Sequence, residues 1–171
     1  MDEVAKLAGV SKQTVYTHFQ NKDRLFSAVI TYVLRQYYPE SLLNAPGPHT
    51  IEEDLRTIGR QYMRLVMSPE AISMYRALVT AAASDPHFSH LFFEAGPVPL
   101  QEDIIRFLQQ AVSEGKLKDG DMHQAASHFG SLLKGDIHFK QSLGLIDTVS
   151  DDEIETHLNS CVEAFLAIYG R

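Results

Sequence analysis

Apolar residues recur at intervals of three and four along almost the entire chain, the spacing that places them on one face of an α-helix. No stretch alternates apolar and polar residues between turn signals, as a half-buried strand would. The pattern therefore predicts an all-α protein. Two short helices are expected at 2–8 and 12–19, and a longer one from 22 to about 38. Six more are expected at about 50–67, 69–84, 86–95, 100–114, 121–143 and 150–169.

Polar residues at capping positions set several of these boundaries. Thr50 with Glu53, and Ser150 with Glu153, have the capping-box spacing, in which each side chain bonds the other residue's backbone N–H. Gly9 is expected to end the first helix, because glycine adopts the left-handed conformation at little cost. A tight turn should therefore join the first two helices.

The segment 39–49, "PESLLNAPGPH", is the clearest linker in the chain. It holds three prolines and one glycine, residues that interrupt helices and mark connections. We expect it to separate an N-terminal unit, residues 1–38, from a helical bundle, residues 39–171. In the helix that precedes it, the inward residues are expected to be Leu25, Phe26, Val29, Val33 and Tyr37.

Composition fits a globular protein, with 44% hydrophobic and 22% charged residues. No apolar run approaches the roughly 18 residues of a membrane helix, so no membrane partner is expected. The single cysteine, Cys161, excludes an internal disulfide framework and fits a cytoplasmic protein. It is expected to be a small buried residue of the last helix.

Charge is distributed unevenly. The chain carries a formal net charge of −7, but residues 1–45 sum to +1 and the remainder to −8. Such an asymmetry would orient the N-terminal end toward a polyanion and repel the rest of the molecule from it.

Two short helices joined by a tight glycine turn match a helix-turn-helix arrangement. At 100° per residue, Val15 and Phe19 of the second helix face inward. The opposite stripe holds Gln13, Tyr16, Thr17 and Gln20. Glutamine, lysine and the threonine methyl can contact base edges in a major groove, whereas hydroxyls suit phosphates. The pattern alone fits a solvated helix face equally well.

The stretch "MDEVAKLAGVSKQTVYTHFQNKDRLFSAVI" closely resembles the DNA-binding domain of the TetR family of bacterial transcriptional regulators. The matching pieces are "AGVSK", "TVYTHF" and "NKDRLF", within residues 2–30. The resemblance implies that Lys12, Gln13 and Thr17 face the groove or read bases. It implies phosphate contacts for Thr14, Tyr16, His18 and Lys22. For His18, packing beside Phe19 fits equally well.

Members of that family carry a further helix before the position of residue 2, usually after a basic arm. The expected fold is thus a helix-turn-helix domain that lacks its first helix, followed by a helical ligand-binding and dimerisation domain. That helix would cover the apolar faces that hold Val4, Leu7, Val15 and Phe19, so we expect these faces to be under-packed.

By the same resemblance, the larger unit should hold a small-molecule pocket. Its stretch "MYRALVTAAASDPHFSHLFFEAG" loosely resembles the AefR-like branch of C-terminal domains. Large or adaptable apolar side chains on consecutive helices could line a pocket, although each also fits a plain bundle core. The candidates are Tyr62, Met63, Met67, Tyr75, Phe92, Phe93, Phe107 and Phe129, with Phe88 as a further one.

The resemblance to the TetR family also implies that the last two helices pair with those of a second copy in an intermolecular four-helix bundle. Small residues that allow close helix approach occur in the first of them at Ser127, Gly130, Ser131 and Gly135. The last helix has apolar residues at three-four spacing: Ile154, Leu158, Cys161, Val162, Phe165, Ile168 and Tyr169. Part of this surface must be buried within the subunit.

No catalytic or cofactor site is expected. His87 and His90 have a spacing that can chelate a metal, but no cysteine lies nearby and no supporting carboxylates stand at fixed offsets. No phosphate-binding glycine loop, nucleophile elbow or paired catalytic carboxylate stands out.

These observations predict a ligand-responsive regulator, most simply a repressor, that binds a pseudo-palindromic operator in double-stranded DNA as a homodimer. A small-molecule effector would act through the helix 21–38, which bridges both units. Two alternatives stay open. One is a helical enzyme or carrier whose first helices are only structural. The other is a helical ligand-binding or dimerisation protein that no longer binds DNA because its first helix is missing.

Overall fold

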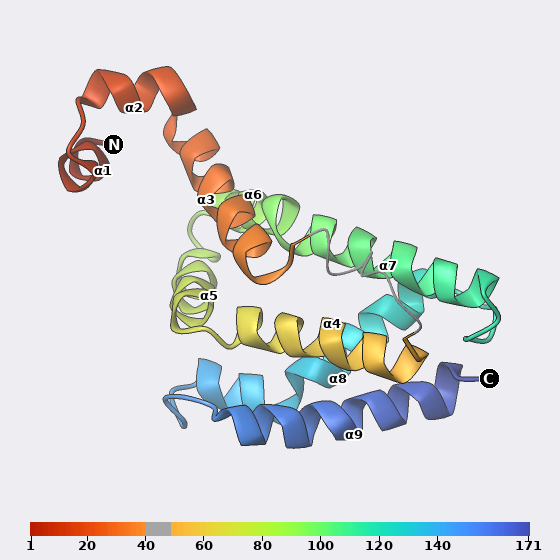
Figure 1. Ribbon diagram of the computed structural model, residues 1–171. Helices are drawn as coiled ribbons and strands as arrows, with labels where there is room; N and C mark the ends of the chain where they lie inside the picture. The colour runs from red at the N-terminus through yellow and green to blue at the C-terminus, as the bar shows by residue number, and fades with distance from the viewer. Residues whose placement is uncertain (40–48) are drawn as a thin grey trace.

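A computed structural model describes residues 1–39 and 49–171, and it confirms the all-α prediction (Figure 1). The predicted linker lies largely outside the described residues, which resume at His49. The helices are α1 (Asp2–Ala8), α2 (Lys12–Phe19), α3 (Lys22–Tyr37), α4 (Ile51–Val66), α5 (Pro69–Ala81), α6 (His87–Ala95), α7 (Pro97–Ser113), α8 (Met122–Ser142) and α9 (Asp151–Tyr169).

The molecule consists of a small N-terminal unit and a larger helical body. Helices α1 and α2 project from the start of α3, and α3 itself packs along α6 and against α4 (Figure 1). Helices α4, α7, α8 and α9 enclose the main core. Its fully buried side chains include Tyr38, Leu55, Ile58, Met63, Leu108, Phe129, Leu133, Leu158 and Phe165. None of the helices in the described ranges is both long and apolar enough to cross a membrane.

Both predicted capping boxes form. The Thr50 hydroxyl accepts the Glu53 N–H, and the Glu53 carboxylate accepts the Thr50 N–H at 2.8 Å. Ser150 and Glu153 repeat this arrangement at the start of α9. Gly9 ends α1 with a φ of 66°, in the left-handed region. These boundaries were predictable because each cap is formed by residues within one turn of the helix end.

Helix α7 begins earlier than the sequence predicted. The expected start was Leu100, but the helix starts at Pro97. The first turn of a helix has no intrahelical acceptors for its N–H groups, so Pro97 and Pro99 lose no hydrogen bond there. The first such bond runs from the Leu100 N–H to the Gly96 carbonyl, at 3.2 Å. Gly96 itself lies against α3, because a Cβ there would be 3.0 Å from Ile30.

Helix α8 was expected to be continuous, but it is kinked at Gly135, where φ is 48° and ψ is −158°. Near the kink the Leu132 carbonyl accepts hydrogen bonds from His157 Nε2 at 3.0 Å and from the Cys161 thiol at 3.2 Å. Cys161 is buried as predicted, and burial raises the pKa of its thiol to about 11. The kink therefore fixes α8 against α9.

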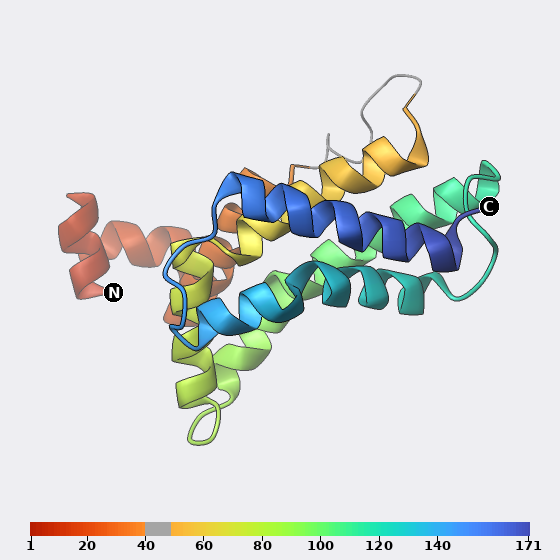
Figure 2. The ribbon, with the colours of Figure 1, turned by 90° about the horizontal axis from the view of Figure 1, so that it is seen from below.

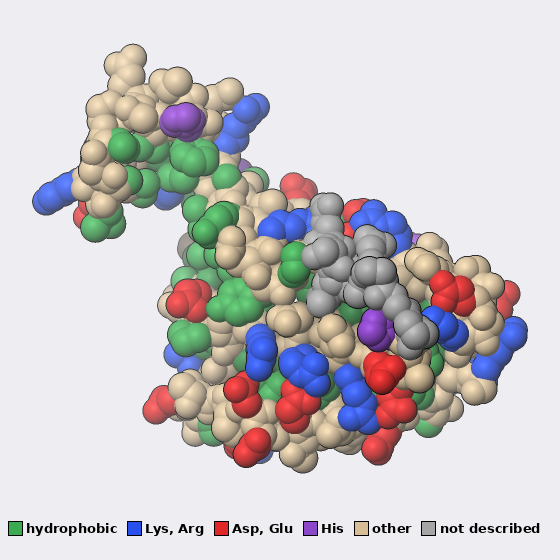
Figure 3. Space-filling view, viewed as in Figure 1, with side chains coloured by type: hydrophobic (Ala, Val, Ile, Leu, Met, Phe, Trp, Pro, Cys, Tyr) green, Lys and Arg blue, Asp and Glu red, His purple; other side chains and the backbone are tan. Residues whose placement is uncertain are grey.

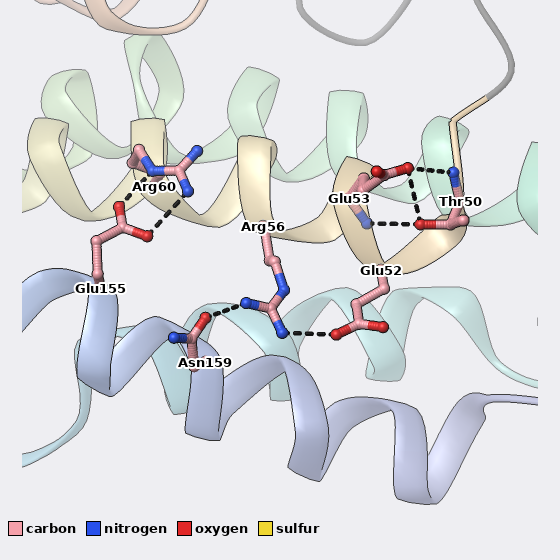
Figure 4. A network of polar contacts seen from close by, with 7 residues as sticks. All are labelled: Thr50, Glu52, Glu53, Arg56, Arg60, Glu155 and Asn159. Atoms are coloured by element: carbon pink, nitrogen blue, oxygen red, sulfur yellow. Dashed lines mark hydrogen bonds and ion pairs between the residues drawn. The ribbon is translucent and has the colours of Figure 1, made fainter.

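Arginines of α4 form a row of polar contacts with α9 (Figure 4). Arg60 binds Glu155 with two parallel hydrogen bonds, and Arg56 donates to Asn159 and to Glu52. In Figure 3 the blue and red side chains of this region alternate over the two helices. Beneath them the backbones approach closely, since a Cβ on Gly59 would lie 2.5 Å from a methyl of Leu158.

One prediction about inward residues was wrong. Val29, expected to face inward, is 45% exposed, and the buried positions of α3 and its cap are Ile30, Leu34 and Tyr38. On the face of α1 that was expected to be under-packed, Val4 is 39% exposed and Leu7 is 89% exposed, whereas Ala5 is buried. The buried side chains of each helix face the helices that pack on it, and three-four spacing alone does not identify those helices.

Candidate nucleic-acid interface

Short-range contacts hold the α1–α2 turn. The Val10 N–H reaches back to the Ala5 carbonyl at 3.0 Å, which closes the turn after Gly9. The Ser11 hydroxyl caps α2 by accepting the Thr14 N–H at 3.0 Å. Val15 is buried, as predicted, and Phe19 is half-buried. The polar side of α2 is consequently held toward solvent.

All seven residues predicted to contact DNA are exposed. They lie on α2 and at the first position of α3: Lys12, Gln13, Thr14, Tyr16, Thr17, His18 and Lys22. The stripe predicted to face outward is completed by Gln20, also exposed. Figure 1 shows that α2 lies away from the helical body.

Lys12 is held by an intramolecular ion pair. Its Nζ lies 2.7 Å from a carboxylate oxygen of Asp2 in α1, and 6.0 Å from the centre of the Tyr16 ring. The hydrogen bond between the two side chains raises the pKa of the Lys12 ammonium and lowers that of the Asp2 carboxyl. Part of the positive potential of α2 is therefore neutralised by the protein itself.

The two threonines of α2 use their hydroxyls locally. Thr17 donates to the Gln13 carbonyl at 2.8 Å, and the Thr14 hydroxyl lies 2.8 Å from that of the cap, Ser11. For Thr17 the methyl group is then the part left for a base contact, as suits a thymine methyl. His18 lies beside Phe19, with ring centres 6.3 Å apart, yet its side chain is exposed. This position is compatible with either role considered for His18.

The turn from α2 to α3 is strained. Gln20 has a φ of 61° and a ψ of −48°, and the Asn21 N–H bonds the Phe19 carbonyl at 2.6 Å. This is a γ-turn with a positive φ at its centre, which is uncommon for a residue with a side chain. Asn21 then caps α3 by accepting the Arg24 N–H at 2.9 Å. Helix α2 is thus joined to α3 by two residues, Gln20 and Asn21, whose backbone and side-chain hydrogen bonds fix the turn.

Sequence reasoning missed the contacts that tie the start of α3 to α6. The Lys22 ammonium lies 4.8 Å from the centre of the Phe88 ring, and His87 Nε2 is 2.9 Å from the Asp23 carboxylate. Phe26 packs on Phe88 edge to face, with ring centres 5.2 Å apart. These pairs are remote in sequence, so no local pattern indicates them.

The predicted pocket residues do not lie in one place. Tyr62, Met63, Met67 and Phe129 are buried in the main core, and Phe107 packs against it. Phe92 is half-buried, whereas Tyr75 and Phe93 are exposed by 43% and 56%. A surface hollow of about 320 Å³ opens at the turn between α7 and α8, but none of these residues lines it.

Within residues 1–39 and 49–171, no group of three or more His, Cys, Asp or Glu side chains is placed to hold a metal ion. His87, which was weighed as a metal ligand with His90, instead contacts Asp23.

The face formed by α8 and α9 is exposed over much of its length, and the two helices lie side by side in Figure 2. Residues buried inside the subunit include Ala125, Phe129, Leu133, Leu158 and Phe165. The exposed residues include small or polar ones, Gln124, Ser127, His128, Ser131, Ser160, Ala164 and Ala167, together with the large apolar Phe139 and Ile168. This is the type of surface that permits close approach of another helix.

Comparisons with known sequences match both parts of the chain. The sequence pattern described as "Bacterial regulatory proteins, tetR family" matches residues 1–29. That of the "AefR-like transcriptional repressor, C-terminal domain" matches residues 53–171. The uncharacterized HTH-type transcriptional regulator YhgD of Bacillus subtilis (strain 168) is 53% identical over 36 residues. That match spans 21% of this chain and only 19% of YhgD.

Solved structures resemble the whole chain. A protein assigned to the TetR family from Mesorhizobium loti MAFF303099 is 29% identical, with a TM-score of 0.84, and the match covers 99% of this chain and 86% of the other. The flavonoid-responsive regulator FrrA is also 29% identical, with a TM-score of 0.75 and the same coverage. A TetR-family regulator from Pseudomonas syringae pv. tomato str. DC3000 is 25% identical, with a TM-score of 0.71, covering 99% and 84%.

Proposed function

Because the chain belongs to the TetR family of bacterial transcriptional regulators, we propose that it is a ligand-responsive repressor that binds a pseudo-palindromic operator as a homodimer. The observation that carries this proposal is the exposed polar set of α2, held clear of the body. Gln13, Thr17 and Lys12 contact base edges, and Thr14, Tyr16, His18 and Lys22 contact phosphates. The protein acts on DNA in the cytoplasm. The alternative, a protein of this fold that ignores DNA, is not favoured by the family.

We further propose that residues 1–38 form the DNA-binding unit and residues 39–171 the effector-binding and dimerisation unit. Two copies associate through the outward faces of α8 and α9, where the small side chains Ser160, Ala164 and Ala167 permit close helix packing. A two-fold dimer of this kind presents two α2 helices to half-sites about one helical turn apart.

Transmission runs along α3, as the sequence predicted for the helix 21–38. The start of α3 is bound to α6 through the Lys22–Phe88 and Asp23–His87 contacts. A shift of α6 relative to α7 would therefore move the residue that bonds phosphate. The effector acts by binding one arrangement more tightly than the other, and the coupling is reciprocal. Flavonoids, the compounds named for FrrA, are the first effectors to examine.

The test is titration of the chain against the DNA upstream of its own coding sequence, followed by fluorescence anisotropy at two salt concentrations. Lys22→Ala and Tyr16→Phe should weaken binding to all sequences, and the lysine change should reduce the salt slope by about one. Gln13→Ala should instead relax preference at one base pair, by about 10-fold or more. Gln36→Ala, an exposed glutamine remote from α2, is the matched control.

If Gln13→Ala loses affinity equally for all DNA sequences, Gln13 does not act as a base reader. Equal affinity of the unchanged protein for operator and unrelated DNA would refute the repressor function itself.

A further inference from the structure

One buried tyrosine has a hydroxyl without a hydrogen-bond partner. Tyr38, the residue that caps the end of α3, is 0% exposed, and its side chain lies in the main core. Among the described residues its hydroxyl oxygen makes no hydrogen bond. A buried polar atom left unpaired costs stability that a phenylalanine of the same shape would avoid. A purely structural role does not explain the hydroxyl.

A buried carboxylate lies nearby. Asp103 of α7 is 3% exposed and binds Arg35 of α3 at 3.1 Å and Arg106 of its own helix. Burial raises the pKa of the Tyr38 phenol, and the negative charge of Asp103 raises it further. The phenol therefore stays protonated and is available as a donor.

The two arginines that bind Asp103 extend to the surface. The Arg106 side chain is 69% exposed and that of Arg35 is 34% exposed, whereas the carboxylate between them is almost completely buried. Asp103 and Arg35 join α7 to α3, and Tyr38 lies in the same core cluster as the apolar residues Leu34 and Ile104.

We propose that the Tyr38 hydroxyl is the hydrogen-bond donor that anchors the effector, and that the effector is an uncharged, largely apolar molecule with a carbonyl or ether oxygen. The donor needs an acceptor oxygen, and the surrounding core favours apolar groups. The field of Asp103 disfavours an anionic oxygen at that position. The proposal rests on the ligand-responsive function above, and it places the effector at the end of α3, on the helix that carries α2.

The test uses two pairs of compounds that differ mainly in a carbonyl group: flavanone with flavan, and fluorenone with fluorene. Isothermal titration calorimetry measures their binding to the unchanged chain, to Tyr38→Phe and to Tyr37→Phe. Tyr37 is the adjacent, half-buried tyrosine of α3 and serves as the matched control. Melting temperatures of the ligand-free proteins are measured alongside, and operator binding is measured on the same samples.

The unchanged chain should bind at least one ketone about 3- to 10-fold more tightly than its hydrocarbon-like partner, the effect of one neutral hydrogen bond. Tyr38→Phe should bind both members of the pair equally, and Tyr37→Phe should keep the preference. Without ligand, Tyr38→Phe should melt about 2 °C or more above the unchanged chain, because the unpaired hydroxyl is gone.

The proposal is overturned if neither ketone binds, if binding shows no carbonyl preference, or if Tyr38→Phe retains that preference. A lower melting temperature for Tyr38→Phe would also overturn it, since the hydroxyl would then have a structural partner. Selective operator binding without carbonyl preference would remove the Tyr38 assignment and leave the regulator function intact. Carbonyl-dependent binding without operator binding would leave the Tyr38 assignment intact and remove the regulator function.

Discussion

Replacing Gly135 with alanine should destabilise the protein, and by more than a glycine-to-alanine substitution at a position with regular helical angles. The backbone angles at this position, φ 48° and ψ −158°, belong to a region that residues with a Cβ seldom adopt. A Cβ there would also lie 2.8 Å from the His157 ring. That ring cannot move away without losing its hydrogen bond to the Leu132 carbonyl.

The expected cost follows from these two terms. Backbone strain contributes about 2 kcal/mol, and the lost hydrogen bond contributes about 1 kcal/mol. A total of about 3 kcal/mol lowers the melting temperature of a chain of this size by roughly 6–12 °C. Urea unfolding followed by circular dichroism gives the free energy, and a thermal scan gives the shift.

Gly115→Ala is the matched control. Gly115 also has a positive φ, 74°, but a Cβ there would meet only the end of the Arg171 side chain, at 3.6 Å. It should cost about 1 kcal/mol. In a His157→Ala background, Gly135→Ala should lose the part of its cost that comes from the ring. If both glycine substitutions cost the same in the unchanged protein, His157 does not hold the kink and the reasoning fails.

Two further predictions concern charge. Asp2→Asn should release Lys12 and raise operator affinity about 2- to 5-fold at low salt, with less gain at high salt. Glu3→Gln changes the net charge equally without touching that lysine and is the control. If Glu3→Gln raises the affinity in the anisotropy titration as much as Asp2→Asn does, that outcome contradicts the argument. Burial, and then the nearby Lys134, lowers the pKa of His138 in the folded chain, so the unfolded chain binds the proton more readily and stability should fall as pH falls from about 7.5 to about 5.5. His138→Gln should flatten that dependence of the urea midpoint, while the exposed His123→Gln should leave it unchanged; an unaltered slope in His138→Gln would show that other groups cause it.

The parts of the fold that the sequence predicted well depend on local chemistry. The capping boxes at Thr50 and Ser150, the glycine end of α1 and the exposed polar side of α2 all involve residues within one or two turns of each other. The positions of the proposed DNA-contacting residues follow for the same reason, since helix periodicity alone brings them to the surface. Their contacts with DNA stay a prediction.

The remainder depends on partners that are remote in sequence. Gly135 looks like a small residue suited to helix packing, and only His157 on the next helix shows it to be a kink. Tyr38 looks like the frayed end of a helix, and only the fold places it near Asp103. The start of α7 was placed at about Leu100 and not at Pro97, because the sequence does not show which turn of the helix comes first. Tertiary contacts, and not local preference, decide each of these positions.

Because α2 is attached through α3, a small tilt of α3 produces a large displacement of the N-terminal unit. Helix α3 has 16 residues, so its axis is about 24 Å long at 1.5 Å per residue. If the end near Tyr38 acts as a pivot, a tilt of about 10° moves the other end by roughly 4 Å. That exceeds the rise of one base pair, about 3.4 Å.

The same geometry converts a small movement within the body into a larger change in the separation of the two α2 helices of a dimer. In a two-fold dimer both units swing in symmetric senses, so the separation of the two α2 helices changes by up to twice the displacement of one. A subtle rearrangement around the pivot, far below the size of a domain movement, would then suffice to take both helices out of register with their half-sites. Because α6 holds α3 at its outer end through Phe88 and His87, the stiffness of that attachment sets how much of the tilt reaches the DNA.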